Sequence, residues 1–176
     1  AHQVDREYRV MDALRDTEVP VPKMFCLCED IEIIGTKFYV MEMIEGRLFT
    51  ETSLPTLVPA ERKAIYLDLA RIMAALHRVD PQAVGLEAFG RPGNYYERQI
   101  GRWTKQYLAS KTEEIEAMDK LIDWLPENIP EQGPTVVVHG DYRLGNVLIH
   151  PTEPRIVAVL DWELSTLGDG LADLGY

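Results

Sequence analysis

Cysteines and basic residues are scarce in this chain. Cys26 and Cys28 are its only cysteines, and 18 lysines and arginines stand against 29 aspartates and glutamates, for a formal net charge of −11. A Cys-x-Cys pair in an extended segment points to opposite faces, so no internal disulfide is expected, and no second cysteine pair completes a zinc site. We expect buried, reduced thiols in a cytoplasmic protein.

The acidic balance and the lack of long apolar runs limit the partners. Nucleic-acid binding requires clustered lysine and arginine, which argues against nucleic acid as a partner. No apolar segment approaches the roughly 20 residues of a membrane-spanning helix, which argues against a membrane. The acidic excess is compatible with a cationic or neutral small-molecule substrate, and the sequence makes no prediction of the oligomeric state.

The first part of the chain is predicted to combine one helix with a small sheet. Residues 5–14 have a helical apolar repeat, and Glu7 lies on the apolar face. A carboxylate there either reaches water at the edge of that face or pairs with a cation that the chain does not obviously supply. Residues 23–29 predict a strand, and residues 31–34 and 37–44 predict a hairpin with a glycine-containing turn.

After Gly46 the pattern becomes mostly helical, and we place a lobe boundary there, between residues 1–46 and 47–176. Apolar periodicity predicts three helices, over residues 59–79, 95–110 and 113–125. In the last of them the residues expected to face inward are Ile115, Met118, Leu121 and Ile122. A loop is predicted at the following prolines, Pro126, Pro130 and Pro134.

The helix predicted over residues 95–110 mixes aromatic and cationic side chains, among them Tyr95, Arg98 and Arg102. Such side chains either line a substrate pocket through stacking and charge, or are amphipathic surface side chains whose charged ends reach water. The sequence is compatible with both interpretations.

The most informative segment runs from His139 to Asn146. Apolar strands are predicted around it over residues 135–138, 146–149 and 155–160, the last two as a hairpin. Asp141 and Asp161 each follow one of these strands. An Asp, an Asn five residues later and an Asp twenty residues after the first indicate a phosphoryl-transfer site, with Asp141 as base and Asn146 and Asp161 as magnesium ligands.

Three other residues near this segment have predicted roles. Arg143 either stabilises charge on a transferring phosphoryl group or is a surface residue of a turn. His139 is expected to pack inward and to hydrogen-bond the backbone. Asp173 is expected to cap a helix or to brace the loop that bears Asp141.

Together these motifs resemble the aminoglycoside phosphotransferase family. The resemblance rests on residues 139–146, 160–163 and 170–174, and residues 38–46 look like the hinge between the family's lobes. Residues 93–103 are similar to the branch of kinase-like domains of the acyl-CoA dehydrogenase 10 and 11 type. The resemblance implies an α+β, protein-kinase-like two-lobe fold, truncated at both ends, with a partial N-terminal-lobe sheet and a mostly helical C-terminal lobe.

The resemblance also implies roles for particular residues. Asp141 would be the catalytic base, Arg143 would match the cation two residues after it, and Asn146 and Asp161 would be the magnesium ligands. The adenine of ATP would bind the backbone of Glu42, Met43 and Ile44. Glu7 would pair with a phosphate-anchoring lysine of the small lobe. The candidates for contact with the acceptor are Glu163, Tyr95, Arg98 and Arg102.

The function implied is ATP- and Mg²⁺-dependent transfer of the γ-phosphate to a hydroxyl of a small molecule, with a hydroxyacyl compound favoured over an aminoglycoside. The family's glycine-rich loop and lysine would precede Glu7, and helices would follow Asp173, so we expect a central fragment that is a poor kinase alone and active in the full-length protein. The alternatives are a nucleotide-binding pseudokinase or regulatory module, and a metal-dependent hydrolase that uses Asp141 and Asp161.

Overall fold

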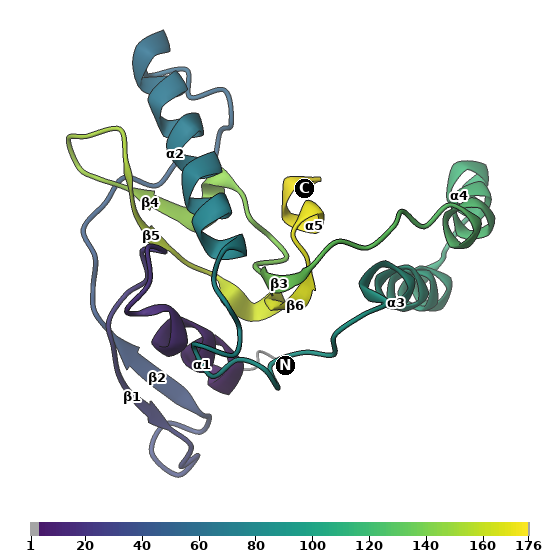
Figure 1. Cartoon of the computed structure of the whole chain (residues 1–176), viewed down its shortest axis with the longest axis horizontal. Helices are drawn as coiled ribbons and strands as arrows, with labels where there is room; N and C mark the ends of the chain where they lie inside the picture. The colour runs from purple at the N-terminus through teal and green to yellow at the C-terminus, as the bar shows by residue number, and fades with distance from the viewer. Residues whose placement is uncertain (1–3, 176) are drawn as a thin grey trace.

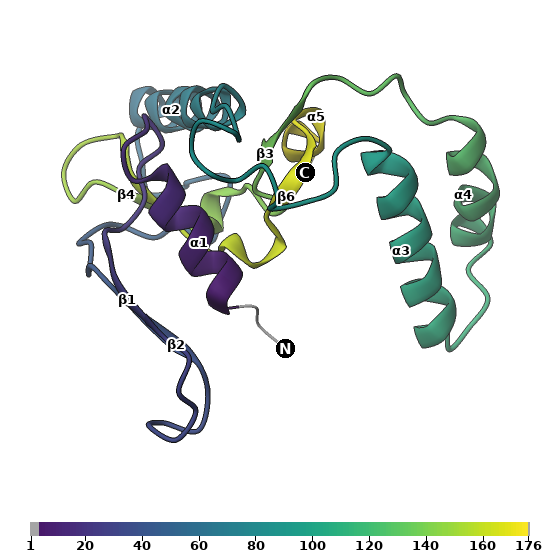
Figure 2. The same ribbon diagram turned by 60° about the horizontal axis from the view of Figure 1, so that its bottom comes forward.

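The computed structural model describes residues 4–175, and Figure 1 shows how their helices and strands are arranged. Helix α1 (Val4–Leu14) lies against a hairpin of β1 (Met24–Cys28) and β2 (Phe38–Met41). Helix α2 (Pro59–His77) contacts β3 (Thr135–Val138) and β5 (Ile156–Val159). Helices α3 (Tyr95–Ser110) and α4 (Glu116–Glu127) pack on each other and project from the rest of the molecule, as Figure 2 also shows.

The C-terminal part of the chain consists of two antiparallel sheets of two strands each. β3 pairs with β6 (Thr166–Asp169), and β4 (Val147–Ile149) pairs with β5. The short 3-10 turns η1 (Leu144–Asn146) and η2 (Trp162–Leu164) precede β4 and β6, and helix α5 (Leu171–Leu174) follows β6. The strands and the hairpin predicted around Asp141 are therefore confirmed, with Asn146 in η1 rather than in the strand.

One apolar core connects α1, α2 and the C-terminal sheets. The apolar periodicity of residues 59–79 predicts a buried stripe of Ile65, Leu69, Ile72, Met73 and Leu76. All five are buried in α2 except Met73, which is partly buried against the same core. Arg6 of α1 donates to the carbonyl oxygens of Phe89 and Ser165 at 2.9 and 3.2 Å. Since Trp162 of η2 is fully buried in the same core, α1 is held against the segment that follows Asp161.

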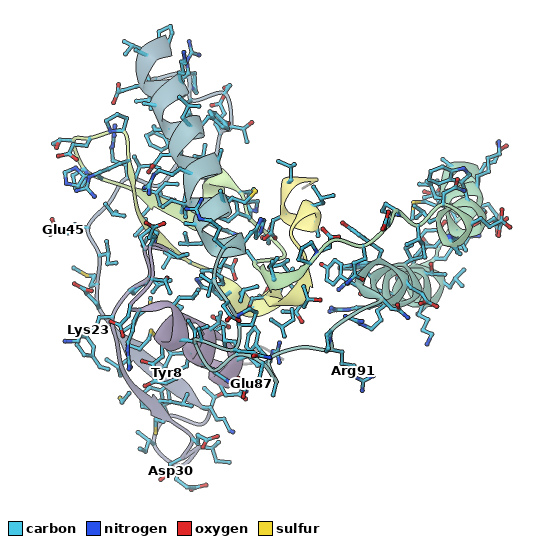
Figure 3. All side chains as sticks on the ribbon, in the orientation of Figure 1. Tyr8, Lys23, Asp30, Glu45, Glu87 and Arg91 are labelled. Carbon is cyan, nitrogen blue, oxygen red and sulfur yellow. The ribbon has the colours of Figure 1, made fainter. Side chains whose placement is uncertain are left out.

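The predicted hairpin of residues 31–34 with 37–44 is wrong. β2 pairs instead with β1, with Cys28 opposite Phe38 and Met24 opposite Met41. Residues 31–34 lie in the turn that joins the two strands, near the hairpin tip where Figure 3 labels Asp30. The three isoleucines of this segment favour a strand by propensity, but they lie on the surface of the turn, and Ile33 is 61% exposed.

The buried state predicted for the two cysteines is also wrong. Both thiols are free, but Cys26 is exposed and Cys28 is partly exposed. A two-stranded sheet covered on one face by α1 leaves its other face to solvent. The pairing of β1 with β2 also shifts register between Met24 and Cys26, and the consecutive residues Phe25 and Cys26 are both exposed.

The interior predicted for residues 113–125 is wrong as well. Helix α4 begins at Glu116, includes Pro126, and buries none of its residues. Ile115 and Leu121 are 42% and 44% exposed, because α3 is the neighbour that α4 contacts among the described elements. Within residues 4–175 no helix has the length and apolar character required to cross a bilayer.

Candidate active site

The loop after β3 holds the Asp141 carboxylate between two donors. Arg143 Nε lies 3.1 Å from Oδ1 and 3.2 Å from Oδ2 of Asp141. Asn146 Nδ2 donates to Oδ2 at 2.8 Å and to the Asp141 carbonyl oxygen at 2.9 Å. The Asp141 side chain keeps 15% of its surface exposed, so the carboxylate is oriented and still accessible to a small molecule. Three of the predicted site residues therefore meet in one loop.

Asp173 of α5 braces this loop, which confirms one of its two predicted roles. Its Oδ2 accepts the backbone N–H of His139 at 2.9 Å, and its Oδ1 accepts that of Gly140 at 2.8 Å. His77 Nε2, at the end of α2, lies 2.9 Å from Oδ2 as well. The Asp173 side chain is completely buried, so these contacts join α2, α5 and the loop in a single polar cluster.

His139 is a structural residue, as predicted. It is fully buried, and its Nε2 donates to the Leu160 carbonyl oxygen at 2.9 Å while its Nδ1 accepts the Asp141 N–H at 3.3 Å. Burial lowers the pKa of His139, which favours the neutral ring. The ring also lies 4.5 Å from the Trp162 ring, so it connects the segment of Asp141 with that of Asp161.

Asn146 and Asp161 are brought together through the backbone. Leu160 N–H donates to the Asn146 carbonyl oxygen at 2.8 Å, which places the residue before Asp161 beside Asn146. Asp161 has a φ of 64°, a left-handed conformation that is uncommon outside glycine and occurs at functional sites. The exposed Asp161 thus turns away from the β5 direction immediately after the strand.

These two side chains fit a magnesium site of few protein ligands. Asn146 uses its amide nitrogen on Asp141, and no hydrogen bond within residues 4–175 uses its Oδ1. Asp161 adds a carboxylate, and Mg²⁺ prefers such oxygen ligands and keeps several waters. No group of three or more His, Cys, Asp or Glu side chains in the described residues is arranged to hold a metal.

Glu7 contacts a residue that the sequence did not single out. Tyr39 of β2 donates its hydroxyl to Glu7 Oε2 at 3.0 Å. Burial, followed by the charges of Glu7 and Asp161, raises the pKa of Tyr39 to about 12. Tyr39 therefore connects the hairpin to the Glu7 carboxylate of α1, and the lysine partner of Glu7 stays a prediction. The sequence signal for this contact was a tyrosine in the strand predicted over residues 37–44, whose hydroxyl can donate a hydrogen bond to a carboxylate.

The segment that follows β2 leaves backbone groups accessible. Glu42 N–H donates to the Lys23 carbonyl oxygen at 2.8 Å and ends the hairpin. Within residues 4–175 no backbone hydrogen bond involves Met43 or Ile44, and Met43 is 86% exposed. A Cβ on Gly46 would lie 2.9 Å from Leu148 Cβ, so the chain returns here in close contact with β4.

The predicted acceptor residues come from two parts of the fold, α3 and η2. Tyr95 is buried, its N–H is bonded to Gln132 Oε1 at 2.8 Å, and its ring fills the space above Gly168 of β6. Arg98 and Arg102 line an open pocket of about 930 Å³ on α3. Glu163 is exposed in η2, two residues after Asp161.

The whole chain, residues 1–176, matches the model of a family described as the phosphotransferase enzyme family. The chain belongs to this family. It is 50% identical to acyl-CoA dehydrogenase family member 10 of Mus musculus and 46% identical to family member 11 of Homo sapiens, over its full length in both cases. It covers 16% and 23% of those two relatives.

Solved structures of phosphotransferases share the fold. A crystal structure described as a "putative aminoglycoside phosphotransferase" of Ralstonia eutropha has a TM-score of 0.94 and 59% identity, over 98% of this chain and 53% of that one. A ternary complex of streptomycin, ATP and APH(2")-IIa has a TM-score of 0.67 at 20% identity, over 96% of this chain and 57% of that one. The predicted family and its α+β, protein-kinase-like fold are confirmed, while the lobe boundary at Gly46 stays a prediction.

A substitution at Gly140 tests how rigid the Asp141 loop is. Its φ is +84°, and an added Cβ would lie 2.7 Å from the Leu164 carbonyl oxygen, whereas Gly85 has a φ of +73° with open space around it. Gly85→Ala is expected to lower the free energy of unfolding by about 1 kcal/mol through backbone strain alone. Gly140→Ala should lower the free energy of unfolding by clearly more than Gly85→Ala, because its Cβ would also clash with the Leu164 carbonyl oxygen. Equal shifts of the urea midpoint in the two variants would show that the loop relaxes freely.

Proposed function

We propose that this chain is the phosphoryl-transfer part of an ATP- and Mg²⁺-dependent kinase that phosphorylates a hydroxyl of a small molecule. The observation that carries the proposal is the Asp141 carboxylate, oriented by Arg143 and Asn146 in a loop braced by buried Asp173. Membership of the phosphotransferase family supports the reaction type.

In the proposed reaction the acceptor hydroxyl oxygen attacks the γ-phosphorus of ATP. The bond between that phosphorus and the oxygen of the leaving ADP breaks, and the hydroxyl proton passes to Asp141. The two contacts from Arg143 and Asn146 orient the carboxylate toward the hydroxyl. Arg143, whose side chain is half exposed, also places a positive charge beside the transferring group.

Asn146 and Asp161 would hold the magnesium ion through an amide oxygen and a carboxylate. A bound Mg²⁺ supplies positive charge that neutralises phosphate oxygens. The Asn146 side chain has a double role in this arrangement, because its nitrogen orients Asp141 while its oxygen stays available. The free backbone groups of Met43 and Ile44, with Glu42 before them, would bind adenine, and Glu7 would pair with the lysine that anchors the phosphates.

For the acceptor we favour a hydroxyacyl compound over an aminoglycoside. The relatives at about 50% identity are named acyl-CoA dehydrogenase family members, and the APH(2")-IIa complex that contains streptomycin shares 20% identity. The Ralstonia structure at 59% identity is described as a "putative aminoglycoside phosphotransferase", so the preference rests on the charge of the α3 pocket as well as on these names. Arg98 and Arg102 would suit an anionic acceptor and would repel a polycationic antibiotic.

ADP release from the full-length protein tests this function. With Mg²⁺ and ATP we expect ADP release in the presence of a hydroxyacyl thioester, and none with the same thioester lacking the hydroxyl. Phosphorus NMR of the product would locate the new phosphate ester. A better rate with an aminoglycoside would contradict the assigned acceptor class. If a broad panel of hydroxyl compounds gave no ADP release, the kinase assignment itself would be wrong.

A further inference from the structure

The open pocket on α3 gathers positive charge in an acidic protein. Arg91, Arg98, Arg102 and Lys105 line it together with one carboxylate, Glu97, so the lining carries an excess of three positive charges, while the chain has a net charge of −11. Figure 3 labels Arg91 on the linker that leads from the body of the molecule to α3. Like charges gathered on one surface repel each other unless an anion compensates them.

None of these four cations makes a salt bridge within the part of the chain that the structure describes. Arg98 instead donates to the backbone carbonyl oxygens of Arg91, at 2.7 Å, and of Gly93. These bonds fix the Arg98 guanidinium and shape the wall of the pocket. Arg102 lies over its neighbour Trp103 at 5.4 Å, and Lys105 is exposed one helical turn further along. Their positive charges are therefore available to a ligand.

We propose that the pocket lined by Arg91, Arg98, Arg102 and Lys105 binds a phosphate-bearing group of the acceptor. This inference rests on the proposed phosphotransferase function. It adds that the acceptor carries a phosphate group in addition to the hydroxyl that is phosphorylated. Arginine forms paired hydrogen bonds with phosphate oxygens, and lysine adds a point charge, so three further cations around the Arg98 guanidinium suit a multiply charged phosphate group.

The position of the pocket adds a requirement on the acceptor. Tyr95 anchors the start of α3 on Gly168 of β6, and β6 follows η2 and Asp161 in the chain. In the register of β3 and β6, Gly168 lies opposite Val136, whereas Asp141 lies beyond the end of β3 at Val138, so the anchor of α3 and the Asp141 loop are at different positions along the sheet. The acceptor is then an extended molecule, with a hydroxyl at one end and a phosphate group at the other.

Binding of inorganic pyrophosphate tests the pocket directly, in the full-length protein with its nucleotide site saturated by ADP and magnesium. Calorimetry should show binding that weakens about tenfold or more in Arg102→Ala/Lys105→Ala, because two charge-assisted contacts are lost. The matched control is Arg62→Ala/Lys63→Ala on α2, which removes the same two charges outside the pocket and should bind pyrophosphate like the unmodified protein. Equal binding by the pocket variant and the control would overturn the proposal.

Kinetics with paired acceptors identify the source of the phosphate. One hydroxyacyl thioester carries a phosphate at the far end of its carrier, and the other is the same compound without it. We expect KM to be about tenfold lower with the phosphate and kcat to be similar. In the pocket variant KM should no longer distinguish the two compounds, and pyrophosphate should compete only with the phosphorylated one.

The outcomes separate the pocket from the reaction. ADP release with equal KM for both acceptors would overturn the pocket proposal and leave the kinase function standing. Pyrophosphate binding without ADP release from either acceptor would overturn the kinase function and, with it, the assignment of the bound phosphate to an acceptor.

Discussion

Replacing Asp141 with asparagine is expected to lower kcat on the order of 10³-fold while KM for ATP changes little. The amide is nearly the same size and retains an oxygen that Arg143 can contact, so the loop should keep its shape. What it loses is the ability to accept the hydroxyl proton. The new amide can also place an NH2 group where the Asp141 oxygen accepts from Asn146, and the hydrogen bond between the two side chains would then be lost.

The measurement is initial-rate ADP release by the full-length protein with saturating acceptor. Asp123→Asn is the matched control, because Asp123 is an exposed aspartate of α4 and undergoes the same change of charge and shape. Its kcat should equal that of the unmodified protein. If Asp141→Asn releases ADP as fast as this control, Asp141 is not the base. Urea denaturation of both variants would show whether a loss of rate reflects unfolding.

Replacing Asp173 with alanine is expected to have the largest effect on stability. The buried carboxylate accepts the N–H groups of His139 and Gly140, and removing it leaves both donors without an acceptor. At about 1–3 kcal/mol for each orphaned group, the free energy of unfolding should fall by about 3 kcal/mol or more. His77, at 2.9 Å, loses its partner as well. The fall should appear as a lower urea midpoint with an unchanged slope.

Two variants of the same helix control this experiment. Leu174→Ala changes a side chain that is 68% exposed and should alter the free energy of unfolding by less than about 0.5 kcal/mol. Asp173→Asn keeps one acceptor oxygen and should lie between the other two. A midpoint for Asp173→Ala equal to that of Leu174→Ala would mean that α5 does not brace the loop.

The grouping of Asp141, Arg143 and Asn146 could be predicted because these residues are close in sequence, while their catalytic roles stay predictions. Asp141 and Asn146 lie in one short loop, and both Asp141 and Asp161 follow apolar runs of strand length. The apolar stripe of α2 could be predicted for a similar reason, because its apolar residues recur every three or four positions within one continuous segment.

Features that depend on the partner of an element could not be predicted in the same way. Residues 31–34 have the apolar composition of a strand, but β2 pairs with β1 instead of with them. Periodicity identifies the apolar side of a helix without saying what covers it. Of the residues predicted to face inward here, Ile115 and Leu121 are exposed, while Met118 and Ile122 are only partly buried. Glu7 on the apolar face of α1 suggested only some partner, and Tyr39 of β2 is one that the fold supplies.

By itself the sequence determined the type of chemistry, since a carboxylate, an amide and a second carboxylate at these spacings suit phosphoryl transfer. Only the tertiary structure decided that Arg143 and Asn146 hold Asp141 and that Asp173 braces the loop from α5. It also decided that four cations, none with a salt bridge in residues 4–175, line one pocket along α3 and the loop before it. The physical reason is that spacing along the chain fixes which groups are available, whereas burial, charge compensation and hydrogen-bond geometry depend on segments that meet only after folding.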